Sequence, residues 1–377
     1  MLNANIVIHY YLYILNINNN LFAISNIIFT MGSINRKGLE VGLVKIGIPQ
    51  GLLYMYYYPF WKTYFEELGF EVVSTPATTK SIIDKGVKMS VPEICVPIKV
   101  YIGHVIQLLE QKEIDYVFVP RFISVNKGQY FCPKFMGLPD MIRHSIKGAE
   151  ERLIMPYIKT SSDNIANAFK NNIFGKKAAF SHRKNKNALE KAQRAWLKFR
   201  DLSKKGYSIV EASDIALGKL SVEEVSPLKP IKEEITIGLL GYVYNIYDPY
   251  ISMDIFNRLK GMGVRLKTFE MLDDIDFDRQ LEPMHKTLFW TFSDKLLAGG
   301  YHFYDDKEVD GLIHVTAFAC GPDSMLGKLL ELDSSIYKKP FMTVRVDEHS
   351  GENHLQTRIE AFVDMIKRKK TNLQRGA

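Results

Sequence analysis

Three cysteines, each one or two residues before a proline, are the residues of this sequence best suited to metal or redox chemistry. They are Cys95 in P-E-I-C-V-P, Cys132 in Y-F-C-P-K and Cys320 in A-C-G-P-D-S. No two of them form the C-x-x-C pair that zinc ribbons and fingers use. Three isolated cysteines could instead bind three irons of a 4Fe-4S cluster, which would leave the fourth iron free for an exogenous ligand. Three buried core cysteines are the alternative interpretation.

The residues around Cys320 predict that this thiol lies where a strand turns into a helix. The apolar run V-T-A-F-A reads as a buried strand, and Gly321-Pro322 then turns the chain. Asp323 or Ser324 is expected to cap the following helix, M-L-G-K-L-L-E-L. Ligands of open α/β sheets bind beyond the carboxyl ends of the strands, and a helix N-terminus lowers the pKa of a nearby thiol. The other two cysteines are also expected in loops or at strand ends.

Motifs of other enzyme classes are missing from the sequence. The histidines show no H-E-x-x-H spacing, and His314 lies in an apolar strand, where a hydrogen-bonded core histidine is expected. There is no G-x-S-x-G elbow, and no G-x-G-x-x-G follows the first strand. G-P-D-S-M-L-G-K is not a phosphate-binding loop, because one residue too many separates its glycines and Leu329 stands where serine or threonine belongs.

The composition predicts a globular protein of two or three domains. The chain has 377 residues, of which 46% are hydrophobic and 24% charged, and domains average ~150 residues. Three cysteines do not make a disulfide scaffold, so a reducing, cytoplasmic setting is expected. The net charge of +7 permits an anionic ligand without demanding one, and we expect no nucleic-acid partner. Asparagines interrupt the apolar runs near the N-terminus before they reach the ~20 residues of a membrane span, so no membrane association is expected.

Strands and helices alternate along the chain, which is typical of a parallel α/β sheet. Short apolar runs predict strands, and F-W-K-T-Y-F-E-E-L-G (60–69) predicts an amphipathic helix that a C-cap glycine ends. A second helix is expected around 99–109. The predicted strands are V-G-L-V-K-I-G-I-P (41–49), F-E-V-V-S-T-P (70–76) and D-Y-V-F-V-P-R-F (115–122).

The same pattern restarts at residue 235. I-T-I-G-L-L-G (235–241) matches V-K-I-G-I-P-Q-G (44–51), and Y-D-P-Y (247–250) matches Y-Y-P-F (57–60). We therefore predict two α/β lobes of like topology, linked by a helical segment and with a cleft between them. Chance similarity between two strand–helix starts is the alternative.

Composition also divides the chain into a tail and two lobes. The first forty residues are an Asn/Ile/Tyr-biased run that reads as an irregular tail, and we expect Met31 to be the natural start, with residues 1–30 translated upstream sequence. V-S-P-L-K-P-I-K-E-E (225–234) has the two prolines and mixed charge of a linker. The predicted parts are the tail 1–40, the first lobe 41–232 and the second lobe 233–377.

A basic segment around 160–206 belongs to the first lobe. Its stretch N-A-L-E-K-A-Q-R-A-W-L-K-F has the periodicity of an amphipathic helix. The apolar stripe consists of Leu189, Ala192, Trp196 and Phe199. The lysines and arginines predict a solvated helix face, and a docking surface for an acidic partner or a phosphate-rich ligand is the alternative.

Several stretches together resemble the acyl-CoA dehydratase activase-related proteins, relatives of the cluster-bearing subunits of 2-hydroxyacyl-CoA dehydratases and of benzoyl-CoA reductase. The resemblance covers about 41–365, nearly all of the chain outside the tail. The most specific stretches are C-P-K-F-M-G-L-P-D-M and C-G-P-D-S. Others are I-G-I-P-Q-G-L-L-Y-M-Y-Y-Y-P-F-W, P-E-I-C-V-P-I-K and D-E-H-S-G-E-N-H-L-Q-T-R-I-E-A-F-V-D-M-I.

The resemblance implies two flavodoxin-like lobes with a 4Fe-4S cluster between them and one iron open. It implies that Cys95, Cys132 and Cys320 are the cluster ligands. It also implies that Lys99, Lys134 and Ser324 surround the cluster, where hydrogen bonds to sulfur tune its potential. Arg358 is expected to be structural and to tie the last helix to its lobe.

The resemblance further implies partners and a reaction class. In the dehydratases an ATP-hydrolysing activase supplies a low-potential electron, which passes through the cluster to an acyl-CoA thioester. This chain shows no nucleotide-binding motif, so it should need the activase in trans, and we expect a homodimer or a heterodimer with a related subunit. Two cubanes bridged by sulfide in a homodimer would serve the reduction of small molecules. A non-catalytic two-lobed binding module and a cluster-carrying partner without turnover are the alternatives.

Overall fold

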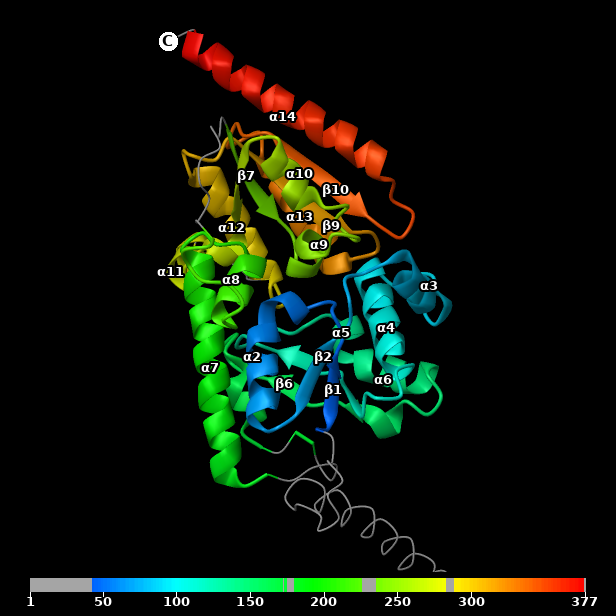
Figure 1. Cartoon of the computed structure of the whole chain (residues 1–377). Helices are drawn as coiled ribbons and strands as arrows, with labels where there is room; N and C mark the ends of the chain where they lie inside the picture. Colours follow the sequence, from blue (N-terminus) through cyan, green and yellow to red (C-terminus); the bar gives the residue numbers. More distant parts are fainter. Residues whose placement is uncertain (1–42, 172, 175–179, 226–234, 283–287, 376–377) are drawn as a thin grey trace, which may run out of the picture.

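The computed structural model describes residues 43–377, apart from 172, 175–179, 226–234, 283–287 and 376–377. The predictions for the tail 1–40 and for a start at Met31 lie outside the described residues, as does nearly all of the predicted linker 225–234. Two lobes stand one above the other in Figure 1, each built on its own parallel sheet. None of the helices in the described ranges combines the length and the apolar character that crossing a membrane requires.

The first lobe contains six strands, seven α-helices and two short 3-10 helices among the described residues. Its strands are β1 (Lys45–Ile48), β2 (Glu71–Ser74), β3 (Tyr116–Phe118), β4 (Arg121–Ser124), β5 (Leu153–Ile154) and β6 (Tyr157–Lys159). Its helices are α2 (Tyr54–Glu67), α3 (Lys80–Lys88), α4 (Val96–Leu109), α5 (Pro133–Met136), α6 (Leu138–Ser145), η1 (Glu150–Arg152), η2 (Ile165–Phe169), α7 (His182–Lys204) and α8 (Ile209–Ala216).

The second lobe contains four strands in its described residues, and it ends in a long helix that runs along its outer side in Figure 1. The strands are β7 (Ile235–Leu240), β8 (Val264–Thr268), β9 (Gly311–Ala317) and β10 (Phe341–Val346). The helices are α9 (Val243–Tyr247), α10 (Ile255–Gly261), η3 (Phe269–Met271), α11 (Asp274–Leu281), α12 (Ser293–Asp305), α13 (Gly321–Asp333) and α14 (Glu352–Arg375). Arg358 of α14 donates a hydrogen bond to the carbonyl oxygen of Thr343 in β10 (2.8 Å).

The two main sheets have the same topology. The first has the strand order β2-β1-β3-β5 and the second the order β8-β7-β9-β10, so in each the first strand lies between the second and the third. Every neighbouring pair of strands in both sheets is parallel. The predicted α/β class with two Rossmann-like lobes is confirmed. Strands β4 and β6 form a separate two-stranded parallel sheet in the first lobe.

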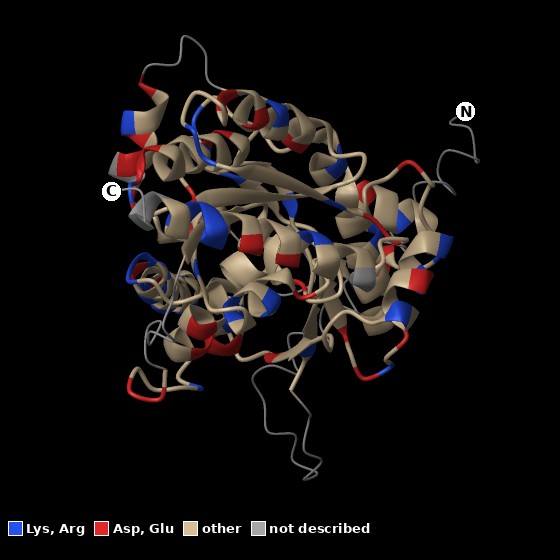
Figure 2. Ribbon diagram, turned by 90° about the horizontal axis from the view of Figure 1, so that it is seen from above, with Lys and Arg blue, Asp and Glu red and all other residues tan. Residues whose placement is uncertain are grey.

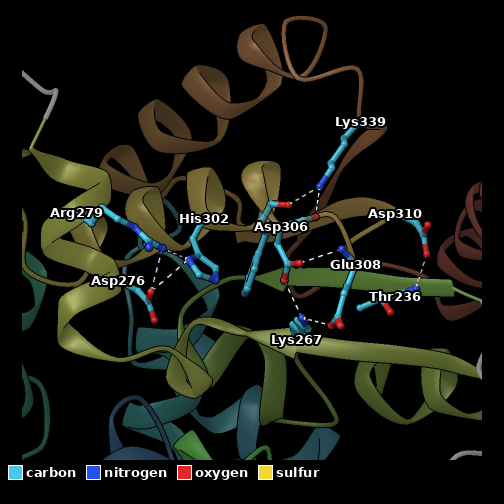
Figure 3. A network of polar contacts seen from close by, with 10 residues as sticks. Thr236, Lys267, Asp276, Arg279, His302, Asp306, Glu308, Asp310 and Lys339 are labelled. Carbon is cyan, nitrogen blue, oxygen red and sulfur yellow. Dashed lines mark hydrogen bonds and ion pairs between the residues drawn. The ribbon is translucent and has the colours of Figure 1, made fainter.

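Matching residues hold the same bonds in the two lobes. Asp115, just before β3, accepts a hydrogen bond from the backbone N–H of Lys45 (2.7 Å) and donates its own N–H to the Lys45 carbonyl. Asp310, just before β9, makes the same two bonds with Thr236 (Figure 3). Residues 44–51 and 235–241 were matched from their sequences alone, and these equivalent hydrogen bonds agree with that match at Lys45 and Thr236.

Glycines in the first strand of each lobe let a helix lie close to the sheet. A Cβ on Gly47 would come within 2.9 Å of Leu108 of α4, and a Cβ on Gly238 within 2.6 Å of Phe303 of α12. Because α4 leads into β3 and α12 leads into β9, these two helices occupy corresponding places in their lobes. The repeat therefore extends from the sheets to the helices that cover them.

Three predicted boundaries are wrong. Helix α2 begins at Tyr54 rather than at residue 60, with Pro59 inside it, because the aromatic side chains of its first turns are buried in the core. The predicted strand 115–122 is divided into β3 and β4 around Pro120, which has no N–H to donate to a ladder. Cys320, and not Asp323 or Ser324, is the N-cap residue of α13, because the helix already begins at Gly321.

The basic segment forms an amphipathic helix, as predicted. Ala192, Trp196 and Phe199 of α7 are buried and Leu189 is half-buried. The exposed lysines of α7 largely pair with acidic side chains, for example Lys191 with Glu67 at 2.7 Å. Further pairs are Lys186–Glu190, Lys204–Asp273 and Lys205–Asp201. Basic and acidic residues are mixed over both lobes (Figure 2), which favours the solvated face over a docking surface for an acidic partner.

Polar side chains bridge the two lobes beside α7. Asp163 accepts hydrogen bonds from Tyr56 of α2 (2.9 Å) and from Lys295 of α12 (3.0 Å). Arg200 of α7 donates to the backbone carbonyl of Glu270 in η3 (3.0 Å). Burial raises the pKa of the Glu270 carboxyl from 4.5 to about 7, although nearby Arg200 acts in the opposite direction.

We expect stability to fall between pH 4.5 and pH 7 because of Glu270. The folded protein keeps a proton on this carboxyl that the unfolded chain releases, so the stabilisation is complete below the unfolded pKa and is lost as the pH rises through about 7. The slope is at most about 1.4 kcal/mol per pH unit. Urea unfolding from pH 4.5 to pH 8 should show a flatter profile for Glu270→Gln than for the parent. Identical profiles would mean that Glu270 is ionised in the folded protein.

Candidate metal centre

Each of the three cysteines is the N-cap residue of a helix. Cys95 precedes α4, Cys132 precedes α5 and Cys320 precedes α13. Their backbones are extended, with φ/ψ of −66/148°, −62/156° and −90/101°. This conformation is the usual one for an N-cap residue, and it directs the side chain toward the free N–H groups of the first turn.

The prolines that follow the cysteines help to start the helices. Pro97, Pro133 and Pro322 lie at the first or second position of α4, α5 and α13. At these positions the fixed φ of proline suits the helix, and its missing N–H would have no partner within the helix anyway. The spacing of cysteine and proline seen in the sequence therefore starts a helix at each thiol.

The three thiols come together where the lobes meet. Burial raises the pKa of each thiol above its ordinary value. Cys132 raises the pKa of Cys95 further, and both raise that of Cys320, so all three lie within electrostatic range of one another. The first-turn N–H groups act in the opposite direction without overcoming burial. A cation bound among the sulfurs would reverse this balance and favour three thiolates.

A small cavity with aromatic walls lies beside Cys132 and Cys320. Its volume is about 30 Å³, and residues of both lobes line it. The lining residues are Leu53, Phe131, Cys132, Phe135, Tyr242, Tyr244, Trp290, Thr291, Phe292, Cys320 and Pro322. The walls keep the sulfurs in an apolar environment, which strengthens electrostatic interactions there.

A family model described as the CoA enzyme activase uncharacterised domain (DUF2229) matches residues 45–272. The chain belongs to this family. The match confirms the predicted resemblance to activase-related proteins of acyl-CoA dehydratases, and it associates the chain with a CoA enzyme and activase system. The matched residues include Cys95 and Cys132 and end before Cys320. No protein with a curated description matches the chain.

Of the residues that the family resemblance adds to the cysteines, Lys134 acts on two of the thiols through its charge. Its Nζ lies 3.4 Å from the carbonyl oxygens of Glu93 and Ala319, so it joins the loops that carry Cys95 and Cys320. Its charge lowers the pKa of both Cys95 and Cys132. In this family member, Lys134 therefore contributes positive charge to the site from the first turn of α5.

The side chains of Lys99 and Ser324 bond to backbone carbonyl oxygens near the cysteines, and Lys99 also pairs with Glu348. Lys99 is buried in α4, donates to the carbonyl oxygen of Pro92 (2.9 Å) and forms an ion pair with Glu348 of the second lobe. Ser324 is exposed, and its hydroxyl donates to the carbonyl oxygen of Cys320 (2.7 Å). Both side chains thus fix the backbone around a cysteine, Lys99 by holding the loop before Cys95.

The donor set consists of thiols, the kind of ligand that an iron–sulfur cluster would take. Within the described residues there is no group of three or more histidine, cysteine, aspartate or glutamate side chains that could hold one metal ion. A cubane distributes its cysteine ligands over different irons, so these ligands lie farther apart than the ligands of one ion. Three free, half-buried thiols, each followed by a helix N-terminus, are the soft ligands that such a cluster takes.

Strained backbone occurs next to the cavity. Ala319 before Cys320 has φ 62°, and Phe292 beside Thr291 has φ 66°. The left-handed region is unfavourable for these residue types, and such strain persists where the surrounding structure enforces it. The two positions were missed from the sequence, as were the aromatic walls Y-V-Y (242–244) and W-T-F (290–292), because no motif marks them. The internal repeat is the one signal that could have pointed to 290–292.

Proposed function

We propose that Cys95, Cys132 and Cys320 hold a 4Fe-4S cluster with one open iron. We further propose that the protein accepts a low-potential electron from an ATP-hydrolysing activase and passes it to a bound substrate, with an acyl-CoA thioester as the class that the family suggests. The observation that carries the proposal is the convergence of three half-buried thiols, from both lobes, on one place. In a reducing compartment, such a trio needs a metal to stay ionised in apolar surroundings.

When bound, the cluster would supply one-electron chemistry and a Lewis-acidic iron. The chain's own residues would do the remaining work. The helix N-termini and Lys134 favour the ionised form of the thiols. The aromatic walls keep water away, and Lys99 holds the Cys95 loop against the second lobe.

An electron donor in trans needs a surface close to the cysteines. Phe318 and Met325 lie on either side of the Cys320 loop and are 64% and 59% exposed. Exposed large apolar side chains at one place are typical of protein-binding surfaces. This position supports docking of the activase, or of a related subunit, on the second-lobe side of the site.

A second function, a cluster-carrying partner without turnover, is favoured by the size of the cavity. About 30 Å³ is room for only a few water molecules. An acyl thioester could not enter it without movement of the walls. Electron transfer between proteins requires no such entry.

The proposal is tested by iron and acid-labile sulfide after anoxic purification and reconstitution. We expect about four irons per chain for a 4Fe-4S cluster, and loss of most of this iron in Cys95→Ser, Cys132→Ser and Cys320→Ser. Ser324→Ala is the matched control, because its hydroxyl bonds a backbone carbonyl and its loss should leave the iron in place. A colourless, iron-free parent after reconstitution would contradict the cluster and leave a two-lobed binding module.

Once the protein contains its cluster, the enzyme function and the carrier function can be distinguished. For either function, an activase and ATP should reduce the cluster and change the visible and EPR spectra of the protein. Consumption of an acyl-CoA thioester is expected only for an enzyme. Reduction that is passed on to a partner protein, with no thioester consumed, would assign the carrier function.

A further inference from the structure

Four helix N-termini surround the site, and the internal repeat relates them in two pairs. Helix α13 begins after Cys320 and directly follows β9, the third strand of its sheet, and α5 begins after Cys132 and follows β3 with β4 between them. Helices α4 and α12 lead into the third strand and pack over the matched glycines Gly47 and Gly238. The two lobes thus bring two equivalent pairs of helix starts to one place.

Cysteine occupies three of these four starts. Cys95 is the N-cap residue of α4, and the N-cap residue of α12 is Phe292, with Thr291 just before it. Thr291 lines the cavity together with Cys132 and Cys320. At the fourth helix start, the polar side chain at the cavity is therefore that of Thr291.

The hydroxyl of Thr291 has no hydrogen-bond partner although the residue is only 3% exposed. Its backbone N–H is fixed by the carbonyl oxygen of Tyr130 (2.8 Å), two residues before Cys132. A buried hydroxyl without a partner is unfavourable unless an ion or a ligand contacts it. Phe292, the next residue, has a strained φ of 66°, which sets the direction of the backbone in this turn.

We infer that the hydroxyl of Thr291 faces the fourth iron, the one that no cysteine ligates, and that it hydrogen-bonds the small group held there. This inference rests on the proposed cluster. The group is small, because the cavity beside Thr291 has a volume of about 30 Å³. A hydroxyl in place of a thiol leaves this iron open to exchange while still orienting whatever binds to it. Thr291 is thereby a positioning residue.

The first test replaces Thr291 with cysteine, under anoxic conditions throughout. Thr291→Cys should keep its four irons and gain a fourth thiolate, since a thiolate is a stronger ligand for iron than a hydroxyl. The EPR spectrum of the reduced parent should change on addition of cyanide, whereas the spectrum of Thr291→Cys should not. A loaded Thr291→Cys protein that responds to cyanide as the parent does would overturn the inference alone.

A second pair of variants covers the case in which Thr291→Cys fails to load or to fold. Thr291→Val removes the hydroxyl with little change in shape, and Thr291→Ser keeps it. Loss of a hydrogen-bond donor should shift the midpoint potential of Thr291→Val to a more negative value, with Thr291→Ser close to the parent. Equal potentials for parent and Thr291→Val would overturn the inference.

Thr316 provides the matched control. It is also a buried threonine whose hydroxyl has no partner, but it lies in β9 and does not line the cavity. Thr316→Val should therefore leave the potential and the cyanide response as in the parent. A shift as large as that of Thr291→Val would overturn the inference by showing a general effect of threonine loss. An iron-free parent would overturn both the inference and the proposed function.

Discussion

We expect Gly103→Ala to lower the free energy of unfolding by about 3 kcal/mol. This value is at the upper end of the destabilisation that overpacking usually causes. Helices α3 and α4 cross at two glycines, where each backbone touches the other. A Cβ on Gly103 would lie 2.0 Å from the carbonyl oxygen of Ile82, and one on Gly86 would lie 1.8 Å from that of Lys99. Because the clashing atoms belong to the backbone, a side-chain rotation cannot relieve them, and the helices must move apart.

The same substitution should also weaken the proposed metal centre. Cys95 is the N-cap residue of α4, so a displacement of α4 moves this thiol away from the other two. Urea unfolding of the iron-free protein measures the stability, and iron content after reconstitution measures the effect on the site. Gly261→Ala is the control, because Gly261 ends α10 with nothing within 4 Å of its Cβ position and an alanine should change stability by about 1 kcal/mol or less. Equal stabilities for Gly103→Ala and Gly261→Ala would contradict the tight crossing.

Local pattern alone was sufficient to predict the parallel α/β class and the repeat, although not strands β5, β6 and β10 or the separate sheet of β4 and β6. Parallel strands buried on both faces are short apolar runs, so 44–51 and 235–241 can be matched from their residue types and order. The start of α2 could not be predicted in the same way, because an aromatic run that contains Pro59 has no clear helical signal. Burial of those aromatic side chains against α7 and the sheet decides their conformation.

The candidate site likewise contains residues that could be predicted from the sequence and one that could not. Cys95, Cys132 and Cys320 stand out in the sequence because local chemistry, a proline in the first turn, marks each of them. Thr291 carries no such mark. Its place beside Cys132 and Cys320 follows only from the way in which the two lobes meet, and its hydroxyl is seen to lack a partner only once the cavity walls are assembled. Contacts between residues far apart in the chain produce no periodic pattern in the sequence, so they cannot be predicted from such a pattern.

Replacing Lys99 with methionine is expected to lower the free energy of unfolding by about 3 kcal/mol, the cost of leaving one partner of a buried ion pair alone. Lys99 is 3% exposed and its partner Glu348 is 18% exposed. The pair joins α4 to the residues after β10, so the variant should also loosen the contact between the lobes beside Cys95. Urea unfolding and iron content after reconstitution are the measurements. Lys328→Met, which breaks the exposed pair with Glu331, is the control and should cost about 1 kcal/mol or less.

The effect of Lys99 should depend on pH in a definite direction. Burial by itself would raise the pKa of Glu348, but the hydrogen bond from Lys99 and further interactions leave this pKa below its ordinary value of 4.5. The pair therefore stabilises the fold above about pH 4.5 and loses this contribution as the pH falls through the lowered pKa of the folded state. The stability difference between parent and Lys99→Met should shrink in acid, and Lys99→Met/Glu348→Gln should recover part of the loss at neutral pH, because no charge is then left unpaired. A difference that stays constant from pH 3 to pH 7 would mean that packing of the lysine chain, and not its charge, holds α4 against the second lobe.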